Sequence, residues 1–147
     1  MRTGQVILLV EDNDADAELT AMAFADAHIG NLLVRMKDGQ EALDYLFAQG
    51  NYAHRTVEDM PTVVLLDLNM PRVSGIEVLK AIRADERIKH LPVIILTSSI
   101  EDRDRLAAYD NHANSYVQKP VDYDQFVTAS RQLGLYWLLL NQPPPSR

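Results

Sequence analysis

Five short apolar segments alternate with helical patterns along this chain, and this alternation constrains its fold more than any other feature. The first, third and fourth segments are continuously apolar and rich in β-branched residues, as expected for strands buried on both faces. The second and fifth are shorter and mixed, which suits outer strands or a second role. The segments are VILLV (6–10), LLVRM (32–36), TVVLLD (62–67), PVIILT (92–97) and SYVQK (115–119).

Apolar residues at helical spacing follow each of these segments. The first helix is expected to bury a face made of Ala15, Leu19, Met22 and Ala23. Strand and helix alternate five times, which predicts a doubly wound α/β fold, a five-stranded parallel sheet with helices on both faces. The expected helices cover residues 14–27, 41–47, 76–84, 102–109 and 126–140.

The chain has 147 residues, of which 47% are hydrophobic and 24% charged, an ordinary composition for a folded domain. We predict one domain over residues 1–140, followed by a Pro-rich tail at 141–147. The segment 48–60 is long for a connection between a helix and a strand. It is either a functional lobe or a tolerated insertion.

Composition and charge exclude several classes of function. The chain has no cysteine, so disulfides and thiolate metal sites are excluded. Its net charge is −7 and it has no basic cluster, so binding to nucleic acid is not expected. No apolar run is long enough for a signal peptide or a membrane span. We therefore expect a soluble, cytoplasmic protein without a membrane segment.

Polar side chains stand where the predicted strands end. In an open parallel sheet the carboxyl ends of the strands lie at one edge, and ligands bind there at the point where the strand order reverses. The sequence thus predicts an acid-lined site that also holds a hydroxyl and an ammonium group. Its members are Glu11 and Asp12 after the first strand, Asp67 after the third, Thr97 after the fourth and Lys119 after the fifth.

Three crowded carboxylates repel one another, and a divalent cation would resolve the repulsion. Mg²⁺ binds one or two carboxylates together with water and phosphate oxygens. With such an ion, one carboxylate can attack an incoming phosphoryl group, and we predict that Asp67 is phosphorylated. Lys119 and Thr97 could hold the other phosphoryl oxygens. Taken alone, Glu11 and Asp12 could also belong to an ordinary helix cap, a reading that can coexist with metal binding.

Four motifs in order resemble the receiver domains of two-component response regulators, which have a flavodoxin-like fold. They are LLVEDN (8–13), LLDLNMP (65–71), ILTSS (95–99) and YVQKP (116–120), and the resemblance covers residues 6 to about 133. It implies that Asp67 is the phosphoacceptor and that Thr97 and Lys119 contact the phosphoryl group. It also implies that Tyr116 changes rotamer with Thr97 on activation, and that the Lys119–Pro120 peptide bond is cis.

The same resemblance implies a Mg²⁺ site and a partner. Asp12, Asp67 and the backbone carbonyl of Asn69 would hold the ion, and Glu11 would act through a metal-bound water. A sensor histidine kinase would supply the phosphoryl group. The chain would not be an enzyme beyond its own phosphorylation and dephosphorylation, and it would signal through contacts with other proteins.

Three less specific stretches of the sequence resemble those of the single-domain regulators that serve bacterial phytochrome histidine kinases. These are the segment 48–60 and the runs LDLNMPRVSGIEVL and HANSYVQKPVDYDQF. They suggest a bacteriophytochrome as the cognate kinase. Three departures from the family pattern are modest. Glu11 replaces the commoner Asp, His112 stands where Gly is usual, and Val73 and Ser74 replace a frequent acidic residue.

Two other functions fit the sequence less well. A phosphatase of the haloacid-dehalogenase type needs a second acid two residues after its nucleophile, and Asn69 stands there. A flavin carrier needs a Ser/Thr/Gly-rich loop after the first strand, whereas this chain has EDNDAD, which would repel the flavin phosphate.

The last predicted helix is apolar on two sides. Its main stripe is expected to face the sheet, and Gly134 suggests a bend. A second apolar side near the end of the helix would need a cover, so we expect a homodimer through this helix, with a fold-back over the tail as the alternative. The main stripe is Phe126, Ala129, Ser130, Leu133, Tyr136, Trp137 and Leu140, and the second side is Val127, Leu135, Leu138 and Leu139.

Overall fold

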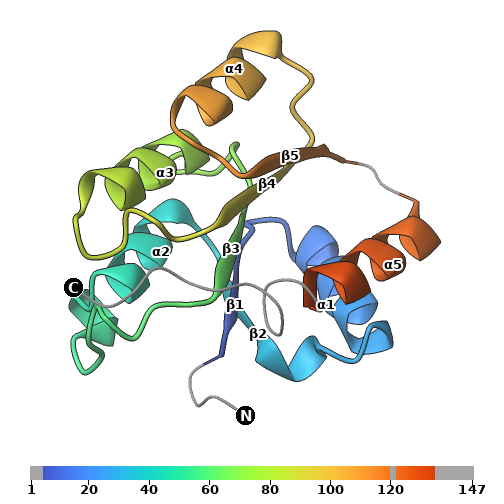
Figure 1. The fold of residues 1–147 in the computed structure, drawn as a ribbon, viewed down its shortest axis with the longest axis horizontal. Coiled ribbons are helices and arrows are strands. Elements are labelled where there is room, and N and C mark those ends of the chain that lie inside the picture. The colour runs from blue at the N-terminus through green and yellow to red at the C-terminus, as the bar shows by residue number, and fades with distance from the viewer. Residues whose placement is uncertain (1–4, 120–121, 135–147) are drawn as a thin grey trace.

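A computed structural model of the chain describes residues 5–119 and 122–134. Its five strands form one sheet in which every neighbouring pair is parallel, and the order is β2-β1-β3-β4-β5 (Figure 1). This confirms the predicted fold class. The strands are β1 (Ile7–Val10), β2 (Leu33–Met36), β3 (Val63–Leu66), β4 (Val93–Thr97) and β5 (Ser115–Gln118).

Burial follows the order of the strands. Every residue of β1 and β3 is buried, and every residue of β4 is buried except Ile94, which is half-buried. The strands β2 and β5 lie at the two edges and are mostly half-buried. The mixed composition of the second and fifth segments therefore identified the outer strands correctly.

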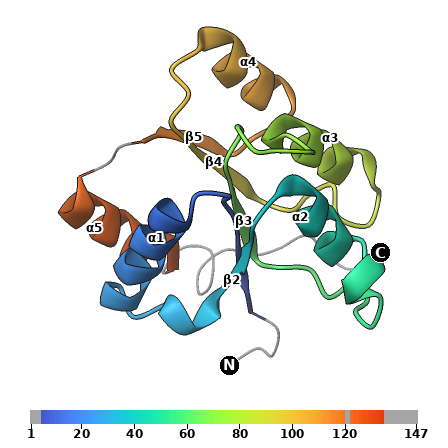
Figure 2. The ribbon, with the colours of Figure 1, turned by 180° about the vertical axis from the view of Figure 1, so that it is seen from behind.

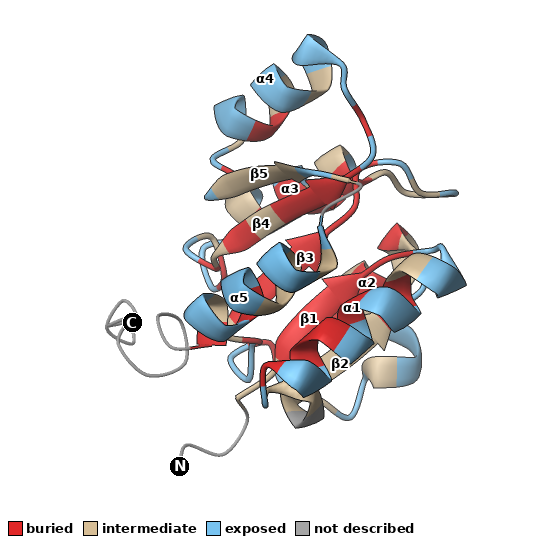
Figure 3. Ribbon diagram, turned by 90° about the vertical axis from the view of Figure 1, so that its right-hand side faces the viewer, coloured by how far each residue is buried: buried red, intermediate tan, exposed pale blue. Residues whose placement is uncertain are grey.

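Helices cover both faces of the sheet, as Figures 1 and 2 show from opposite sides. Helices α1 (Asp14–Asp26) and α5 (Tyr123–Leu133) pack together on one face. Helices α2 (Gly39–Leu46), α3 (Gly75–Ala84) and α4 (Asp102–Asp110) lie on the other face. Two short 3₁₀ helices, η1 (Gly30–Leu32) and η2 (Gly50–Tyr52), follow α1 and α2. Figure 3 shows the buried residues between these layers.

Short polar residues begin most of the helices. Asn13, Asp38 and Asp122 accept a hydrogen bond from a backbone N–H in the first turn of α1, α2 and α5. Ser74 and Glu77 form a capping box at the start of α3. Such caps satisfy N–H groups that have no partner within the helix, so the local sequence specifies where these helices start.

The face that α1 buries differs from the prediction. Ala15 is exposed, and so are Leu19 (41%) and Met22 (53%); of the expected face only Ala23 is buried. The helix instead buries Ala17, Thr20, Ala23 and Phe24. Small side chains on this face let α1 pack closely beside α5, and Phe24 fills the space against Phe126 at a ring-centroid distance of 6.4 Å.

The segment 48–60 packs as a lobe against α2. The ring of Tyr52 lies edge-on to Tyr45 at 5.3 Å, and the guanidinium of Arg55 lies 3.7 Å from the centre of the Tyr45 ring. The Tyr52 hydroxyl donates to Glu41, and Val57 is buried. Aromatic and cation–π contacts of this kind order a loop that carries little regular structure of its own.

Helix α5 carries the first part of the predicted C-terminal stripe. Phe126 and Leu133 pack against the core and Ser130 is buried, but Ala129 is exposed. Gly134 has a helical backbone conformation, with φ −59° and ψ −47°. Val127, from the predicted second apolar side, is half-buried in α5. The other predicted residues of this helix lie outside the described part of the chain, as does Pro120. Among the helices that the structure describes, none is long and apolar enough to cross a membrane.

Candidate functional site

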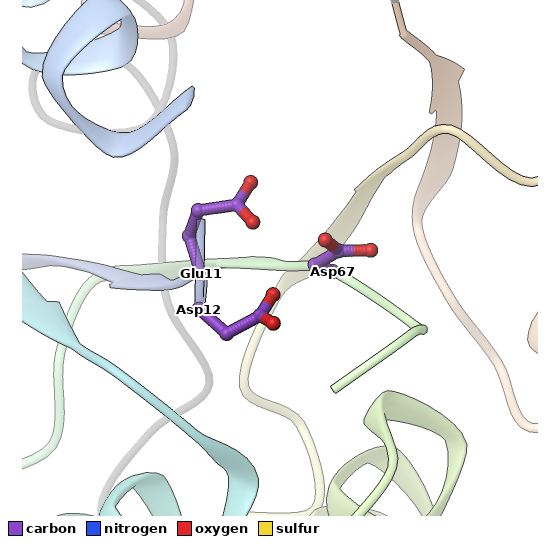
Figure 4. A group of neighbouring side chains, drawn as sticks. All are labelled: Glu11, Asp12 and Asp67. Carbon is purple, nitrogen blue, oxygen red and sulfur yellow. The ribbon is translucent and has the colours of Figure 1, made fainter. Parts of the chain in front are cut away.

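Three carboxylates meet at the carboxyl ends of two neighbouring inner strands, β1 and β3. Glu11 and Asp12 follow β1 and Asp67 follows β3, and each residue offers an oxygen within 4.8 Å of the others (Figure 4). Strand β1 lies between β2 and β3, so the chain leaves the two strands in opposite directions at this point of the sheet. The structure therefore brings the three predicted acids together at the reversal of strand order.

Backbone hydrogen bonds hold the acidic residues in place. The N–H of Asp67 donates to the carbonyl of Val10 at 3.1 Å, and the N–H of Glu11 donates to that of Met36 at 3.0 Å. These bonds extend the sheet by one residue beyond β3 and β1. Gly75 approaches the backbone so closely that a Cβ atom there would lie 2.2 Å from the carbonyl oxygen of Asp67. A glycine at the start of α3 is thus required for the Asp67 loop to close.

Lys119 enters the site from the end of β5. Its ammonium lies 2.6 Å from a carboxylate oxygen of Glu11, 2.9 Å from one of Asp16 and 3.5 Å from one of Asp67. Its backbone N–H donates to the carbonyl of Thr97 at 2.7 Å, which fixes the lysine beside the end of β4. Lys119 is therefore where the sequence predicts it, although it contacts Glu11 and Asp16 more closely than Asp67.

Burial and charge perturb two titratable groups of the site. Burial raises the pKa of Glu11 to about 7, against the opposing effect of the hydrogen bond from Lys119. Burial would by itself lower the pKa of Lys119. Hydrogen bonds to Glu11 and Asp16 and the nearby charge of Asp67 outweigh it, so the pKa of Lys119 lies above its ordinary value. The ammonium is consequently charged throughout the physiological range.

Thr97 and Tyr116 lie on the β4 and β5 side of the site. Thr97 is the last residue of β4 and is fully buried, and its hydroxyl accepts a hydrogen bond from the N–H of Ser99 at 3.4 Å. The Tyr116 hydroxyl donates to the carbonyl of Ser99 at 3.3 Å. The Ser99 hydroxyl in turn lies 2.6 Å from Asp104 in α4. The two predicted switch residues are thus both hydrogen-bonded to the loop that leads into α4.

Asn69 is exposed beside the phosphoacceptor candidate. Its backbone N–H donates to a carboxylate oxygen of Asp67 at 3.2 Å. The bond makes a tight local turn after β3, in which the loop folds back on the aspartate. The use of the Asn69 carbonyl as a metal ligand stays a prediction.

Two residues of the site were not predicted from the sequence. Asp16, in the first turn of α1, pairs with Lys119, which lies 103 residues away in the chain. Arg35, in β2, donates from Nε at 3.0 Å and from a terminal nitrogen at 2.8 Å to the carbonyl of Glu11. It also pairs with Asp14 at 2.8 Å. Arg35 therefore holds the acidic loop against the edge strand.

The donor set fits a hard divalent cation. Glu11, Asp12 and Asp67 offer oxygen ligands alone, and their oxygens are close enough to share one ion. Asp12 is exposed while the other two are buried, so an ion here would keep access to water and to an incoming phosphate. Asp12 and Asp67 could bind Mg²⁺ directly. Glu11 pairs closely with Lys119, and its contact with an ion through water stays a prediction.

Comparison with known families gives one match over most of the chain. The sequence model of the response regulator receiver domain matches residues 7–131. Among curated proteins, the probable methanogenesis regulatory protein FilR2 of Methanothrix harundinacea is 40% identical over 95% of this chain and 87% of its own length. The response regulator Rcp1 of Synechocystis is 34% identical over 91% of this chain and 89% of its own length.

Solved structures agree with the sequence comparison. The phosphorylated cyanobacterial phytochrome response regulator RcpA is 36% identical and superposes with a TM-score of 0.82, covering 96% of this chain and 99% of its own. The Mn²⁺-bound form of Rcp1 superposes with a TM-score of 0.81 over the same shares, at 33% identity. Both solved structures therefore share the fold of nearly the whole chain.

Proposed function

Because this chain belongs to the response regulator receiver domain family, whose members accept a phosphoryl group in two-component signalling, we propose that Asp67 is its phosphoacceptor. The observation that carries the proposal is the setting of this carboxylate. Asp67 is buried at the reversal of strand order, beside two further acids and 3.5 Å from the ammonium of Lys119. Lys119 supplies one positive charge for the transferred group, and the neighbouring acids could hold a metal ion that supplies a second.

The neighbouring residues have distinct roles in this proposal. Asp12 and Asp67, with the carbonyl of Asn69, would hold Mg²⁺, and Glu11 would bind it through water. When bound, Mg²⁺ neutralises negative charge on the phosphoryl oxygens. A crystal form of the relative Rcp1 is described as Mn²⁺-bound, which supports a divalent cation at this site.

The transfer itself is a displacement at phosphorus. A carboxylate oxygen of Asp67 forms the new P–O bond while the bond between phosphorus and the donor atom breaks, and the donor leaves with that electron pair. In the expected reaction the donor atom is a nitrogen of a kinase histidine. Lys119 and the Thr97 hydroxyl then hold phosphoryl oxygens. Tyr116 changes rotamer when Thr97 moves toward the phosphoryl group, which carries the signal into the loop before α4.

The partners follow from the family and from the relatives. A receiver domain takes its phosphoryl group from a histidine kinase, and RcpA is described as a phytochrome response regulator. We propose that the cognate kinase is a bacteriophytochrome and that the chain acts through contacts with other proteins. We further propose that it forms a homodimer through the predicted C-terminal helix.

Intact-mass analysis tests the phosphoacceptor. The chain is incubated with acetyl phosphate, with and without Mg²⁺, beside an Asp67→Asn variant. We expect one phosphoryl adduct that requires both Mg²⁺ and Asp67, with acetate as the leaving group. Asp59→Asn, which removes an exposed acid of the lobe 48–60, is the control and should be phosphorylated as the unaltered chain is. An adduct that persists in Asp67→Asn would place the acceptor elsewhere.

A further inference from the structure

Lys119 divides its hydrogen bonds among three carboxylates. An ammonium has three N–H donors, and Lys119 directs them at Glu11, Asp16 and Asp67. The distances are 2.6, 2.9 and 3.5 Å, so the contact with the phosphoacceptor is the longest of the three. In this arrangement the lysine is held toward β1 and α1 and is only partly available to Asp67.

The three acids differ in their exposure to solvent, and therefore in the free energy it costs each of them to lose its contact with Lys119. The Glu11 side chain is 2% exposed and that of Asp67 is 8% exposed, whereas that of Asp16 is 42% exposed. A carboxylate that loses its ammonium partner must be solvated by water, and of these three acids only Asp16 is substantially exposed to solvent. Asp16 is thus the contact that Lys119 can give up most easily.

An acid in the first turn of a helix often serves the helix alone, since it stabilises the positive end of the helix dipole. In α1, Asp14 occupies the same turn and its carboxylate pairs with Arg35 of β2. Asp16 is directed instead to the site, and its backbone N–H is already capped by Asn13. Its contact with Lys119 is therefore a feature beyond helix capping.

We propose that Asp16 is a positioning residue, which holds Lys119 back from Asp67 in the unphosphorylated protein and yields it when the phosphoryl group arrives. This inference rests on the proposed function, since it takes Asp67 as the acceptor. A phosphoryl group brings between about 1.5 and 2 negative charges and strong acceptor oxygens. Lys119 then donates to these oxygens the hydrogen bond that Asp16 had accepted. The carboxylate of Asp16 becomes solvated by water.

Asp16 competes with the phosphoryl group for the lysine, so its charge opposes the phosphorylated state. Removal of the carboxylate should favour every ligand that needs Lys119 at Asp67. The same removal should not favour Mg²⁺, because it takes one negative charge away from the neighbourhood of the metal site. A role in helix stability alone predicts no gain for either ligand.

Beryllofluoride, which mimics a phosphoryl group on a carboxylate, tests the proposal. Its dissociation constant is measured by calorimetry at saturating Mg²⁺ for the unaltered chain and for Asp16→Asn, and the Mg²⁺ affinity is measured separately. Since Asp16 is partly exposed, we expect beryllofluoride to bind about two- to fivefold more tightly to Asp16→Asn. Mg²⁺ should bind equally well or more weakly. Asp16→Ser, a second replacement at the same position, should shift both affinities in the same directions.

Glu18→Gln is the matched control, because it removes one exposed negative charge from the same helix. It should leave the beryllofluoride affinity unchanged. Unchanged or weaker beryllofluoride binding by both Asp16 variants would overturn the inference, as would an equal gain in Glu18→Gln. A chain that binds beryllofluoride normally but shows no Asp16 effect would leave the proposed function standing. A chain that binds none would overturn both.

Discussion

At the scale of single residues, Arg83 joins two loops at the amino ends of β4 and β5. Its guanidinium donates to the carbonyls of Lys89 at 3.0 Å and Leu91 at 2.6 Å, before β4. It also donates to the carbonyl of His112 at 2.7 Å and to the Asn114 side chain at 3.4 Å, before β5. The fork of an arginine can reach acceptors on two loops at once, which a lysine cannot.

Replacement of Arg83 should therefore destabilise the fold. We expect Arg83→Met to lower the free energy of unfolding by about 2–3 kcal/mol, since several carbonyls lose a charged donor. Arg83→Lys should recover less than half of this loss. Urea unfolding measures the change. Arg87→Met is the control, because it removes an exposed ion pair with Asp85, a type worth at most about 1 kcal/mol. Equal losses in the two methionine variants would contradict this account.

The residues of the site were predictable to different degrees. Glu11, Asp12, Asp67 and Lys119 follow strand segments, and parallel strands end at one edge, so their meeting follows from the pattern. Asp16 could not be found in this way, because its contact with Lys119 depends on how α1 is rotated about its own axis. That rotation is set by packing against α5 and not by local spacing.

At the scale of elements, three helices end in the same unusual way. His28, Ala48 and His112 follow α1, α2 and α4 with φ values of 64°, 53° and 64°, the left-handed conformation that favours glycine. At the end of α4, the N–H of His112 donates to Tyr109 and that of Ala113 donates to Ala108, each at 2.9 Å. This pair of bonds is a Schellman motif. A left-handed residue with a side chain is strained by about 1–2 kcal/mol.

His112→Gly should relieve that strain. Part of the gain is offset because glycine makes the unfolded chain more flexible, by about 0.4–1 kcal/mol, so we expect a net stabilisation of about 0.5–1 kcal/mol. The His112 side chain is exposed, so little packing is lost. His112→Ala, which keeps the Cβ atom, should show no such gain. Thermal unfolding of the three proteins decides, and a destabilised glycine variant would show that the imidazole supports the turn.

Hydrophobic periodicity predicted where the helices lie but not which face of α1 is buried. The helices start within a few residues of their predicted positions because short polar caps mark most of these starts. The predicted end of the last helix lies outside the described residues. The buried face of α1 was wrong, since Leu19 and Met22 form one apolar side and Ala17, Ala23 and Phe24 form another. Packing against α5 selects the second side, and spacing alone carries no information on that choice.

At the scale of the whole molecule, the strand order decides where chemistry gathers. Continuously apolar segments became the inner strands and mixed segments became the edges, so composition separated the two groups. The position of β1 between β2 and β3 places the acids of two strands side by side. The relative order of the inner strands is set by the connections between layers, which the apolar patterns do not encode.

The proposed homodimer belongs to this scale as well. Each copy carries a net charge of −7, so two copies repel one another over distances of a Debye length or more. An association driven by apolar side chains must overcome this repulsion, and added salt should strengthen it by screening the charges. An interface built on ion pairs would weaken instead. The salt dependence of the sedimentation coefficient at micromolar concentration therefore separates the two kinds of interface.

Two variants locate the interface. Leu139→Asp places a charge on the second apolar side of the predicted C-terminal helix, in the part of the chain that the structure does not describe. Leu106→Asp places the same charge on α4, where the leucine is 63% exposed and offers a competing apolar surface. We expect Leu139→Asp to sediment as a monomer and Leu106→Asp to remain dimeric, with and without beryllofluoride. The reverse result would move the interface to α4, and a monomeric unaltered chain under all conditions would remove the dimer altogether.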